Sequence, residues 1–396
     1  MKKIILWLLV LIPCFIKADG VTYEASIGDN YYSTLEEAYE AAKTDDVIVL
    51  RSNVSLEKTL VVSKKIVINM NGKNIQAKQE VLSVKNGNLK LTGKGTILET
   101  TPTLYGILLR GSKSVNDTDY SIVEVGKDVT VKAWAPIFID HYDADNKVSY
   151  GVKALIYGNL IGTDNQSDSS GPGVYINGDV KNKTNYPQVT LYDGASITAT
   201  GPGIYQAGYA KTIVNKATIT GIESGIAIKS GILNLLGATI NATGAKKDPV
   251  AASGSVNPTG AVLQIESNKA YAGDMEITID GGTYTSKNSY VVVEYLAEGT
   301  DQTQVKSFEI KSGKFTSGSG VPIFLLSSSF KEKFGKFIKG GEFSEDVNDY
   351  KTVSKEYDID IEEEKKSPFG IIIVIVVLLV AGYFGYKYYL KNYKKY

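Results

Sequence analysis

The sequence predicts an all-β fold, a right-handed parallel β-helix, and three observations lead to this fold class. The first is a repeated unit whose isoleucines follow one another at spacings of 22 and 21 residues: Ile197, Ile219 and Ile240. A period of this length is typical of stacked repeats. The second is that small or apolar residues alternate with polar ones around each isoleucine, as in a strand with one buried face. The third is the content of turn residues, since 39 glycines and 10 prolines fit frequent turns between short strands.

The predicted β-helix runs over residues 81–350 and contains roughly ten coils. Its later coils carry aromatic residues at the place where earlier coils have isoleucine: Tyr284, Phe315 and Phe343. These larger rings should widen the core toward the C-terminal end of the stack.

A second recurring strand predicts a stripe of apolar and aromatic side chains on one outer face. Its outward members are expected to be Leu108, Phe138, Tyr175, Tyr205, Ala227, Leu263 and Phe324. Long exposed apolar stripes often mark a binding surface, and aromatic rings can stack on sugar rings. We therefore predict that Phe138, Tyr175 and Tyr205 bind a ligand. The alternative is that insertions such as residues 164–170 or 245–259 fold over the stripe.

Residues 19–80 are predicted to form an N-terminal cap and the first coils. The one clear soluble helix begins here, because Ser33 or Thr34 can cap its first turn and Glu36 or Glu37 can complete a capping box. We expect this capping helix to cover the open end of the stack, where apolar core and unpaired strand edge would otherwise meet water.

The first coils also carry a family resemblance. The run YYSTLEEAYEAAKTDDVIVL from Tyr31, followed by LVVSKKIVINMNGKNI from Leu60, resembles the opening of pectate-lyase-like right-handed β-helices in bacterial cell-surface proteins. The resemblance implies the β-helical fold. It implies little about activity, because this fold hosts lyases, hydrolases and non-catalytic adhesins.

The first 18 residues are typical of a secretory leader. Residues 1–18 begin with Lys2 and Lys3, continue with an apolar run and end with the small residue Ala18, which predicts a signal peptide. The alternative is a lipoprotein leader in which Cys14, the only cysteine of the chain, is lipidated.

The C-terminal residues predict an anchor. A charged spacer at residues 351–367 precedes an apolar run at residues 368–387, which is long enough for a transmembrane helix. The lysines of residues 388–396 should keep this tail cytoplasmic. We therefore expect a single-pass protein of the cell membrane with an extracellular N-terminal ectodomain.

The densest polar cluster follows the strand that contains Phe138. Asp140, Asp143 and Asp145 offer oxygen ligands at short spacing, as a Ca²⁺ site would require, but the Gly and distal Glu of an EF-hand loop are missing. A solvated loop is the alternative interpretation, and catalysis at this loop is a third. No other cofactor is predicted.

Charge and composition narrow the possible functions. The formal net charge is +0, so no overall field attracts nucleic acid. Arg51 and Arg110 are the only arginines and His141 is the only histidine, and no catalytic set of a polysaccharide lyase or glycoside hydrolase is recognised. We expect a membrane-anchored extracellular binding or adhesion protein that contacts a polysaccharide or a surface-protein ligand. The alternatives are a lyase or hydrolase with an unfamiliar site, and a structural surface spacer.

Overall fold

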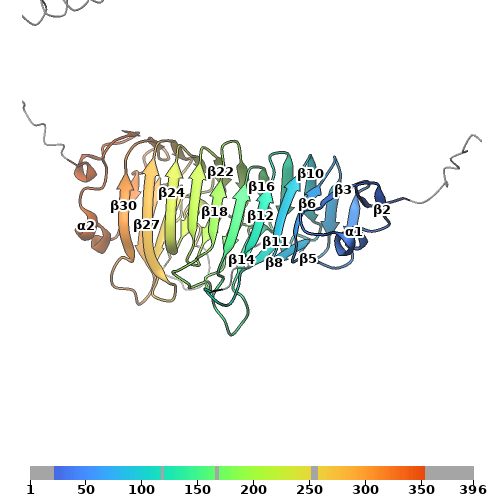
Figure 1. The fold of residues 1–396 in the computed structure, drawn as a ribbon. Helices are drawn as coiled ribbons and strands as arrows, with labels where there is room; N and C mark the ends of the chain where they lie inside the picture. The colour runs from blue at the N-terminus through green and yellow to red at the C-terminus, as the bar shows by residue number, and fades with distance from the viewer. Residues whose placement is uncertain (1–21, 117–119, 166–168, 251–256, 353–396) are drawn as a thin grey trace, which may run out of the picture. The chain divides into compact units, whose positions relative to one another are not determined.

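The computed structural model describes residues 22–116, 120–165, 169–250 and 257–352. Within them the chain winds into coils of three strands, and equivalent strands of successive coils pair into three long sheets. Figure 1 follows this stack from β3 in blue to β30 in orange. The pairing is parallel along the stack, so the predicted parallel β-helix is confirmed as the architecture of the described residues.

From β3 to β32, each sheet takes every third strand of the chain. The first sheet contains, in order, β2 (Asn30–Tyr32), β1 (Ala25–Ile27), β3 (Val47–Leu50), β6 (Lys65–Asn69), β9 (Asn88–Thr92), β12 (Ser121–Val125), β15 (Val152–Ile156), β18 (Gln188–Leu191), β21 (Lys211–Asn215), β24 (Ser230–Leu236), β27 (Gly273–Asp280) and β30 (Val305–Ile310). The second contains β4 (Val54–Leu56), β7 (Asn74–Ala77), β10 (Gly95–Glu99), β13 (Val129–Ala133), β16 (Asn159–Gly162), β19 (Ser196–Ala199), β22 (Thr218–Gly221), β25 (Thr239–Ala242), β28 (Thr283–Ser286), β31 (Lys314–Thr316) and β33 (Glu342–Phe343). The third contains β5 (Leu60–Val62), β8 (Leu82–Lys85), β11 (Tyr105–Arg110), β14 (Ala135–Asp140), β17 (Val174–Ile176), β20 (Pro202–Gln206), β23 (Ser224–Ile228), β26 (Leu263–Ser267), β29 (Val292–Leu296) and β32 (Phe324–Leu325).

The number of coils follows from the first sheet. Two of its 12 strands, β1 and β2, pair antiparallel at its N-terminal edge, which leaves 10 parallel strands, one for each coil of the described residues.

The inner column of the second sheet confirms the repeat that the sequence displays. Ile197 pairs with Ile219 and Ile219 with Ile240, and each of these side chains is at most 1% exposed. The column continues through three rings that stack on one another, at centroid distances of 4.9 and 4.7 Å: Tyr284, Phe315 and Phe343. The alternation of two therefore places one residue of each repeat in a shared apolar interior.

A short helix lies at the N-terminal end of the stack, as predicted. Helix α1 (Leu35–Ala41) packs against β1, β2 and β3 (Figure 1). Thr34 Oγ1 accepts a hydrogen bond from the Glu37 backbone N–H, and the Glu37 side chain accepts one from the Thr34 backbone N–H. This capping box satisfies backbone donors that a helix start leaves free. The helix buries Leu35, Ala38 and Tyr39.

A second short helix near the C-terminal end was not predicted from the sequence. Helix α2 (Ser328–Phe334) begins after Ser327, whose Oγ accepts a hydrogen bond from the Phe330 backbone N–H. Phe330 is buried edge-on against the rings of Phe308 and Phe337. A 3₁₀ turn, η1 (Asn348–Tyr350), follows the last strand.

The predicted fold class is wrong in one part, the transmembrane helix. Across the described ranges, no helix is both long enough and apolar enough to cross a membrane. The two α-helices of these ranges have 7 residues each, which corresponds to about 10 Å of helix, whereas the hydrocarbon core of a bilayer is roughly 30 Å thick. The fold class is therefore corrected to an all-β parallel solenoid with two short helices. The segments predicted as signal peptide (1–18), transmembrane helix (368–387) and tail (388–396) lie outside the described residues, as does the charged spacer (351–367) after its first two residues.

Candidate functional site

The outward-facing column of the third sheet is the stripe that the sequence predicts. In the register of neighbouring strands it runs through Val61, Ser83, Leu108, Phe138, Tyr175, Tyr205, Ala227, Gln264, Val293 and Leu325. Phe138 and Tyr205 do not belong to the apolar interior of the stack, and Tyr205 forms a separate cluster with Ala207 and Ala227. The predicted outward orientation of Phe138, Tyr175 and Tyr205 is therefore confirmed.

Two expected members of this stripe are wrong by one residue. Leu263 pairs with Ile226, and Phe324 pairs with Val292, so both side chains belong to the inward column. In β26 and β32 the register with the preceding strand is shifted by one residue from the one that the sequence alternation suggested. Such a shift moves each side chain to the other face of the strand.

The predicted ligand-binding residues differ in how far water reaches them. Phe138 is 4% exposed and Tyr205 is 5% exposed, whereas Tyr175 is half-buried. Two half-buried rings that the sequence analysis missed complete the aromatic surface: Tyr105 stacks on Phe138 at 4.0 Å, and Trp134 lies 6.1 Å from both Tyr105 and Tyr175. Phe138 therefore supports the accessible rings from below and does not itself offer a face to a ligand.

A polar network lies beside these rings, in the next outward column of the same strands. Arg110 Nη2 donates to Asp140 Oδ2 at 2.8 Å, and Asn177 Nδ2 donates to Asp140 Oδ1 at 2.7 Å. His141 Nδ1 lies 2.8 Å from the same Oδ1 atom. The Arg110 and Asp140 positions pair directly between β11 and β14, and Asn177 directly follows β17. The Asp140 carboxylate thus organises three partners, all at least partly accessible to solvent.

We call Tyr105, Trp134 and Tyr175, together with Arg110, Asp140, His141 and Asn177, the aromatic–polar face. Burial raises the pKa of Tyr105 to about 12, and the Asp140 carboxylate adds to this rise. Burial likewise raises the pKa of Tyr175 to about 12. Both phenols are therefore neutral at physiological pH, so each presents an uncharged ring and a hydroxyl that can donate a hydrogen bond.

The predicted calcium ligands do not converge. Asp140 is engaged with Arg110 and Asn177, while Asp143 Oδ1 accepts hydrogen bonds from the backbone N–H groups of Asp145 and Asn146. These bonds, with one from the Asn146 side chain as the largest cause, lower the pKa of Asp143 and fix a loop turn. Among the residues that the structure describes, no group of three or more His, Cys, Asp or Glu side chains is placed to hold a metal ion.

The same outward columns look different farther along the sheet, over β20, β23, β26 and β29. Lys229 and Glu266 are 2% and 1% exposed, and Lys229 Nζ lies 3.0 Å from Glu266 Oε2. Tyr295 Oη donates to the same oxygen at 2.8 Å, and Asn268 Nδ2 donates to Glu266 Oε1 at 2.8 Å. We call Lys229, Glu266, Asn268 and Tyr295 the buried polar cluster. A buried carboxylate needs this many partners, because an unpaired buried charge is costly.

A loop after β26 accounts for this burial. The Tyr271 ring packs on the cluster of Tyr205, Ala207 and Ala227, and Lys229 Nζ lies 4.7 Å from its centre. The loop is tied down by Lys181 Nζ, which donates to the Ala270 carbonyl at 3.2 Å. The ring also requires a glycine below it, because a Cβ atom at residue 178 would lie 2.3 Å from Tyr271 Cε1.

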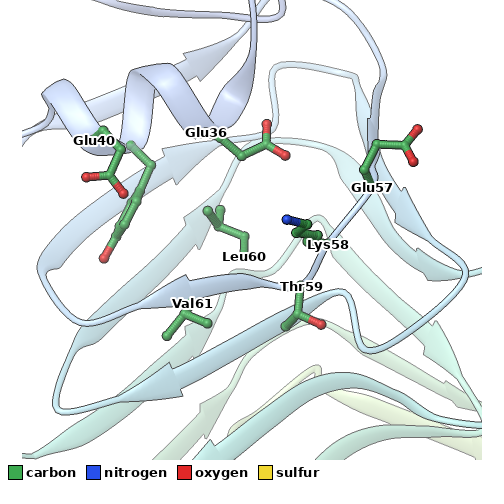
Figure 2. Close-up of a pocket in the computed structure, with 8 residues that line it drawn as sticks. Glu36, Glu40, Glu57, Lys58, Thr59, Leu60 and Val61 are labelled. Atoms are coloured by element: carbon green, nitrogen blue, oxygen red, sulfur yellow. The ribbon is translucent and has the colours of Figure 1, made fainter.

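A hollow of about 310 Å³ opens at the N-terminal end of the same face, where the outward column begins with Val61. Figure 2 shows Glu36 and Glu40 on α1 at one side, and Glu57 and Lys58 on the turn before β5 at another. Leu60 and Val61 lie on β5 below them, Thr59 lies just before β5, and Tyr39 also lines the hollow. None of the residues of the aromatic–polar face lines this hollow, so the two are separate features of one sheet.

Sequence reasoning found part of the site and missed the rest. It found Phe138, Tyr175, Tyr205 and Asp140, because these occupy the repeated strand or follow it directly. It missed Tyr105 and Trp134, which lie at or just before the starts of β11 and β14, outside the alternation that was followed. It also missed the buried polar cluster, whose signal was a lysine and a glutamate at equivalent positions of two successive repeats.

Comparison of the chain with protein-family models, with curated proteins and with solved structures gives no match.

Proposed function

We propose that this chain is a polysaccharide-binding protein, and that the aromatic–polar face of β11, β14 and β17 is its binding site. The observation that carries the proposal is the placement of three half-buried rings, Tyr105, Trp134 and Tyr175, beside a hydrogen-bonded set of charged and amide side chains.

The chemistry of a sugar ring matches this arrangement. Its C–H face is apolar and stacks on an aromatic ring, while its hydroxyl groups at the ring edge need hydrogen-bond partners. The Arg110 guanidinium has five N–H donors, and the ion pair with Asp140 uses only some of them. The Arg110 side chain is 37% exposed, so the other N–H groups can meet a ligand. Concave or flat sites that combine aromatic walls with a few convergent polar groups are typical of small-molecule and carbohydrate ligands.

The extent of the face suits a chain of sugars. Neighbouring strands lie about 4.8 Å apart, so the steps from β11 to β17 span roughly 10 Å, enough for more than one ring. The resemblance of the first coils to pectate-lyase-like proteins of bacterial surfaces adds to the proposal, because that fold includes both polysaccharide enzymes and adhesins.

The test is retention of the full-length chain on a panel of immobilised polysaccharides: polygalacturonate, hyaluronate, a β-glucan and a mannan. We expect at least one of these polysaccharides to retain the wild-type protein, and we expect the protein not to shorten that polysaccharide. The Tyr175→Ala change should weaken that retention by about tenfold, since loss of one stacking ring corresponds to roughly 1.4 kcal/mol.

The chain offers a matched control on other sheets. Tyr157 and Tyr192 also form a stacked, half-buried pair, with ring centres 4.2 Å apart, but neither contributes to the third sheet. Tyr157→Ala should leave retention unchanged. Equal loss in both variants, or no retention of the wild type on any polymer, would contradict the proposal.

The enzyme alternative is separated by the same experiment. Incubation of the wild-type chain with each soluble polymer should leave the chain length of the polymer unchanged, as judged by gel filtration and by the number of reducing ends. New chain ends that depend on Asp140 or His141 would replace the binding proposal by a lyase or hydrolase.

A further inference from the structure

The buried polar cluster brings together an amine, a carboxylate and a carboxamide in a site closed to water. Lys229, Glu266 and Asn268 are 2%, 1% and 3% exposed. A lysine that is this buried is rare in proteins. We propose that Lys229 and Asn268 become joined by an intramolecular isopeptide bond, and that Glu266 transfers the proton in this reaction.

The Glu266 carboxylate holds both reacting groups, one on each oxygen. Lys229 Nζ lies 3.0 Å from Oε2, and Asn268 Nδ2 donates to Oε1 at 2.8 Å. The backbone fixes this arrangement, because Ile228 pairs with Ile265 in the register of β23 and β26, so that Lys229 and Glu266 follow at equivalent positions. Asn268 lies two residues beyond Glu266, on the same side of the chain. Reacting groups held in this way gain the rate advantage of an intramolecular reaction.

The amide carbonyl has a donor where negative charge would develop. The backbone N–H of Ala270 donates to Asn268 Oδ1 at 3.0 Å. An N–H group fixed at this position stabilises the oxyanion that forms when an amine attacks the carbonyl carbon. The Asn268 backbone is also held, since its N–H donates to Gln304 Oε1 at 2.8 Å.

The surroundings keep water away from the reacting groups. Tyr295 Oη donates to Glu266 Oε2 at 2.8 Å, and the Tyr271 ring lies 4.7 Å from Lys229 Nζ. In the proposed reaction the Lys229 ammonium first gives a proton to the Glu266 carboxylate, 3.0 Å away, which yields a neutral amine and a neutral acid. The free amine is the nucleophile, as it is for other reactive lysines.

The covalent step is balanced without any oxidant or cofactor. The Lys229 Nζ electron pair forms a bond to Asn268 Cγ, and the bond from Cγ to Nδ2 breaks. Glu266 gives the proton of the first transfer to Nδ2, which leaves as ammonia, and then takes the second proton from Nζ. Glu266 passes this second proton to the ammonia, which is released as ammonium. The products are one secondary amide and a Glu266 carboxylate restored to its starting state.

The bond would tie the coil that contains β23 to the loop that follows β26. That loop carries Tyr271 over the face of the third sheet and is anchored through the Ala270 carbonyl. A covalent link at Asn268 therefore fixes the cover over this part of the stack.

The test is peptide mapping of the full-length wild-type chain by mass spectrometry after digestion with trypsin. Trypsin does not cut after an acylated lysine, so we expect a branched product in which residues 217–246 are joined to residues 248–269. Its mass should be lower than that of its two linear parts by one ammonia. Cleavage after Lys229 and recovery of both linear peptides would overturn the proposal and leave an ordinary buried ion pair.

Two variants sharpen the result. Glu266→Gln keeps the shape of the side chain but cannot take up the proton, and Asn268→Ala removes the carbon that is attacked, so both should give only linear peptides. Lys183, which is exposed and forms an ion pair with Asp274, provides an internal control that must be cleaved normally in every sample. An ammonia loss without branching would indicate cyclisation of Asn268 alone and would also overturn the proposal. Should a variant fail to fold, the wild-type digest still decides.

Discussion

The third sheet presents the same two outward columns along its length, yet its two halves differ in what reaches water. Over β11, β14 and β17, the open half, half-buried rings lie beside an Asp140 network whose arginine is 37% exposed. Over β20, β23, β26 and β29, the covered half, the equivalent columns hold Tyr205 and the Lys229–Glu266 pair, with every one of these side chains at most 5% exposed. The strands are alike, so the loops make the difference.

The register of the coils places rings and polar groups on one face in both halves, and the loop after β26 decides whether these groups reach water. In the open half the repeat places rings and polar groups side by side, and they remain accessible. In the covered half the loop that carries Tyr271 is pinned by Lys181 and turns the same surface into a second, small interior. One half is suited to a ligand, and the other to stability.

The largest effect should come from breaking the buried pair of the covered half. Lys229→Met leaves the Glu266 carboxylate buried without its cation, which costs about 3–5 kcal/mol of the free energy of unfolding relative to a chain that keeps the Lys229 ammonium. Lys147 and Asp179 form an exposed pair at 3.1 Å with side chains 52% and 39% exposed, so Lys147→Met should cost less than about 1 kcal/mol. Urea denaturation followed by circular dichroism measures both.

The two contributions to this loss can be separated. Asn268→Ala removes the proposed crosslink but leaves the ion pair of Lys229 and Glu266 in place. Its effect on the urea midpoint, subtracted from that of Lys229→Met, gives the share of the buried charge. Equal stability of Lys229→Met and Lys147→Met would mean that the cover over this half is open in solution.

A smaller effect on stability should distinguish Tyr205 from Tyr175, which the sequence analysis placed in the same predicted binding stripe. Tyr205→Ala removes a ring enclosed between Tyr175 and Ala227, and we expect a loss of about 3 kcal/mol in the free energy of unfolding. Tyr175→Ala removes a ring that is partly in water, and the expected loss is about 1 kcal/mol. Thermal unfolding of both variants, beside their polysaccharide retention, should show stability falling more in the first and binding falling more in the second.

The sequence determined the coils well because their signal is local and repeated. Ile197, Ile219 and Ile240 follow a strict alternation, and a solenoid gives every repeat the same surroundings. The cap of α1 was also local, since Thr34 and Glu37 are three residues apart. The helix α2 has no such pattern, because its burial depends on rings of other coils, and the membrane-spanning helix was predicted from a run of apolar residues that lies outside the described chain.

The site was predicted only where it coincides with the repeat. Alternation gives the side of a strand on which a residue lies, and this was right for Phe138, Tyr175 and Tyr205. It does not give burial by a loop, so it could not distinguish Tyr175 from Tyr205. The contact of Lys229 with Glu266 joins residues of two coils separated by an insertion, and its partner Tyr271 comes from a loop with no periodic signal.

The smallest expected effect is on the pH dependence of stability, which depends on the half-buried phenols of Tyr105 and Tyr175 in the open half. The pKa values of Tyr105 and Tyr175, about 12 in the folded chain, lie above the ordinary tyrosine pKa of about 10 expected when the chain is unfolded. Above pH 10 the unfolded chain therefore releases protons that the folded chain retains, so stability that is fully present below about pH 10 is lost progressively up to about pH 12. The Tyr175→Phe change removes one such phenol and should make the decline in urea midpoint between these pH values less steep.

A phenol-free change provides the comparison for this slope. Phe138→Leu removes a ring that stacks on Tyr105 and should lower the urea midpoint by a similar amount at every pH, with no change of slope from its own titration. Burial also raises the pKa of Tyr205 in the covered half, so Tyr205→Phe should flatten the decline as well. A decline of the wild type that is unaffected by either phenylalanine variant would show that neither half shields its tyrosines from water, which would contradict the contrast in solvation between the two halves.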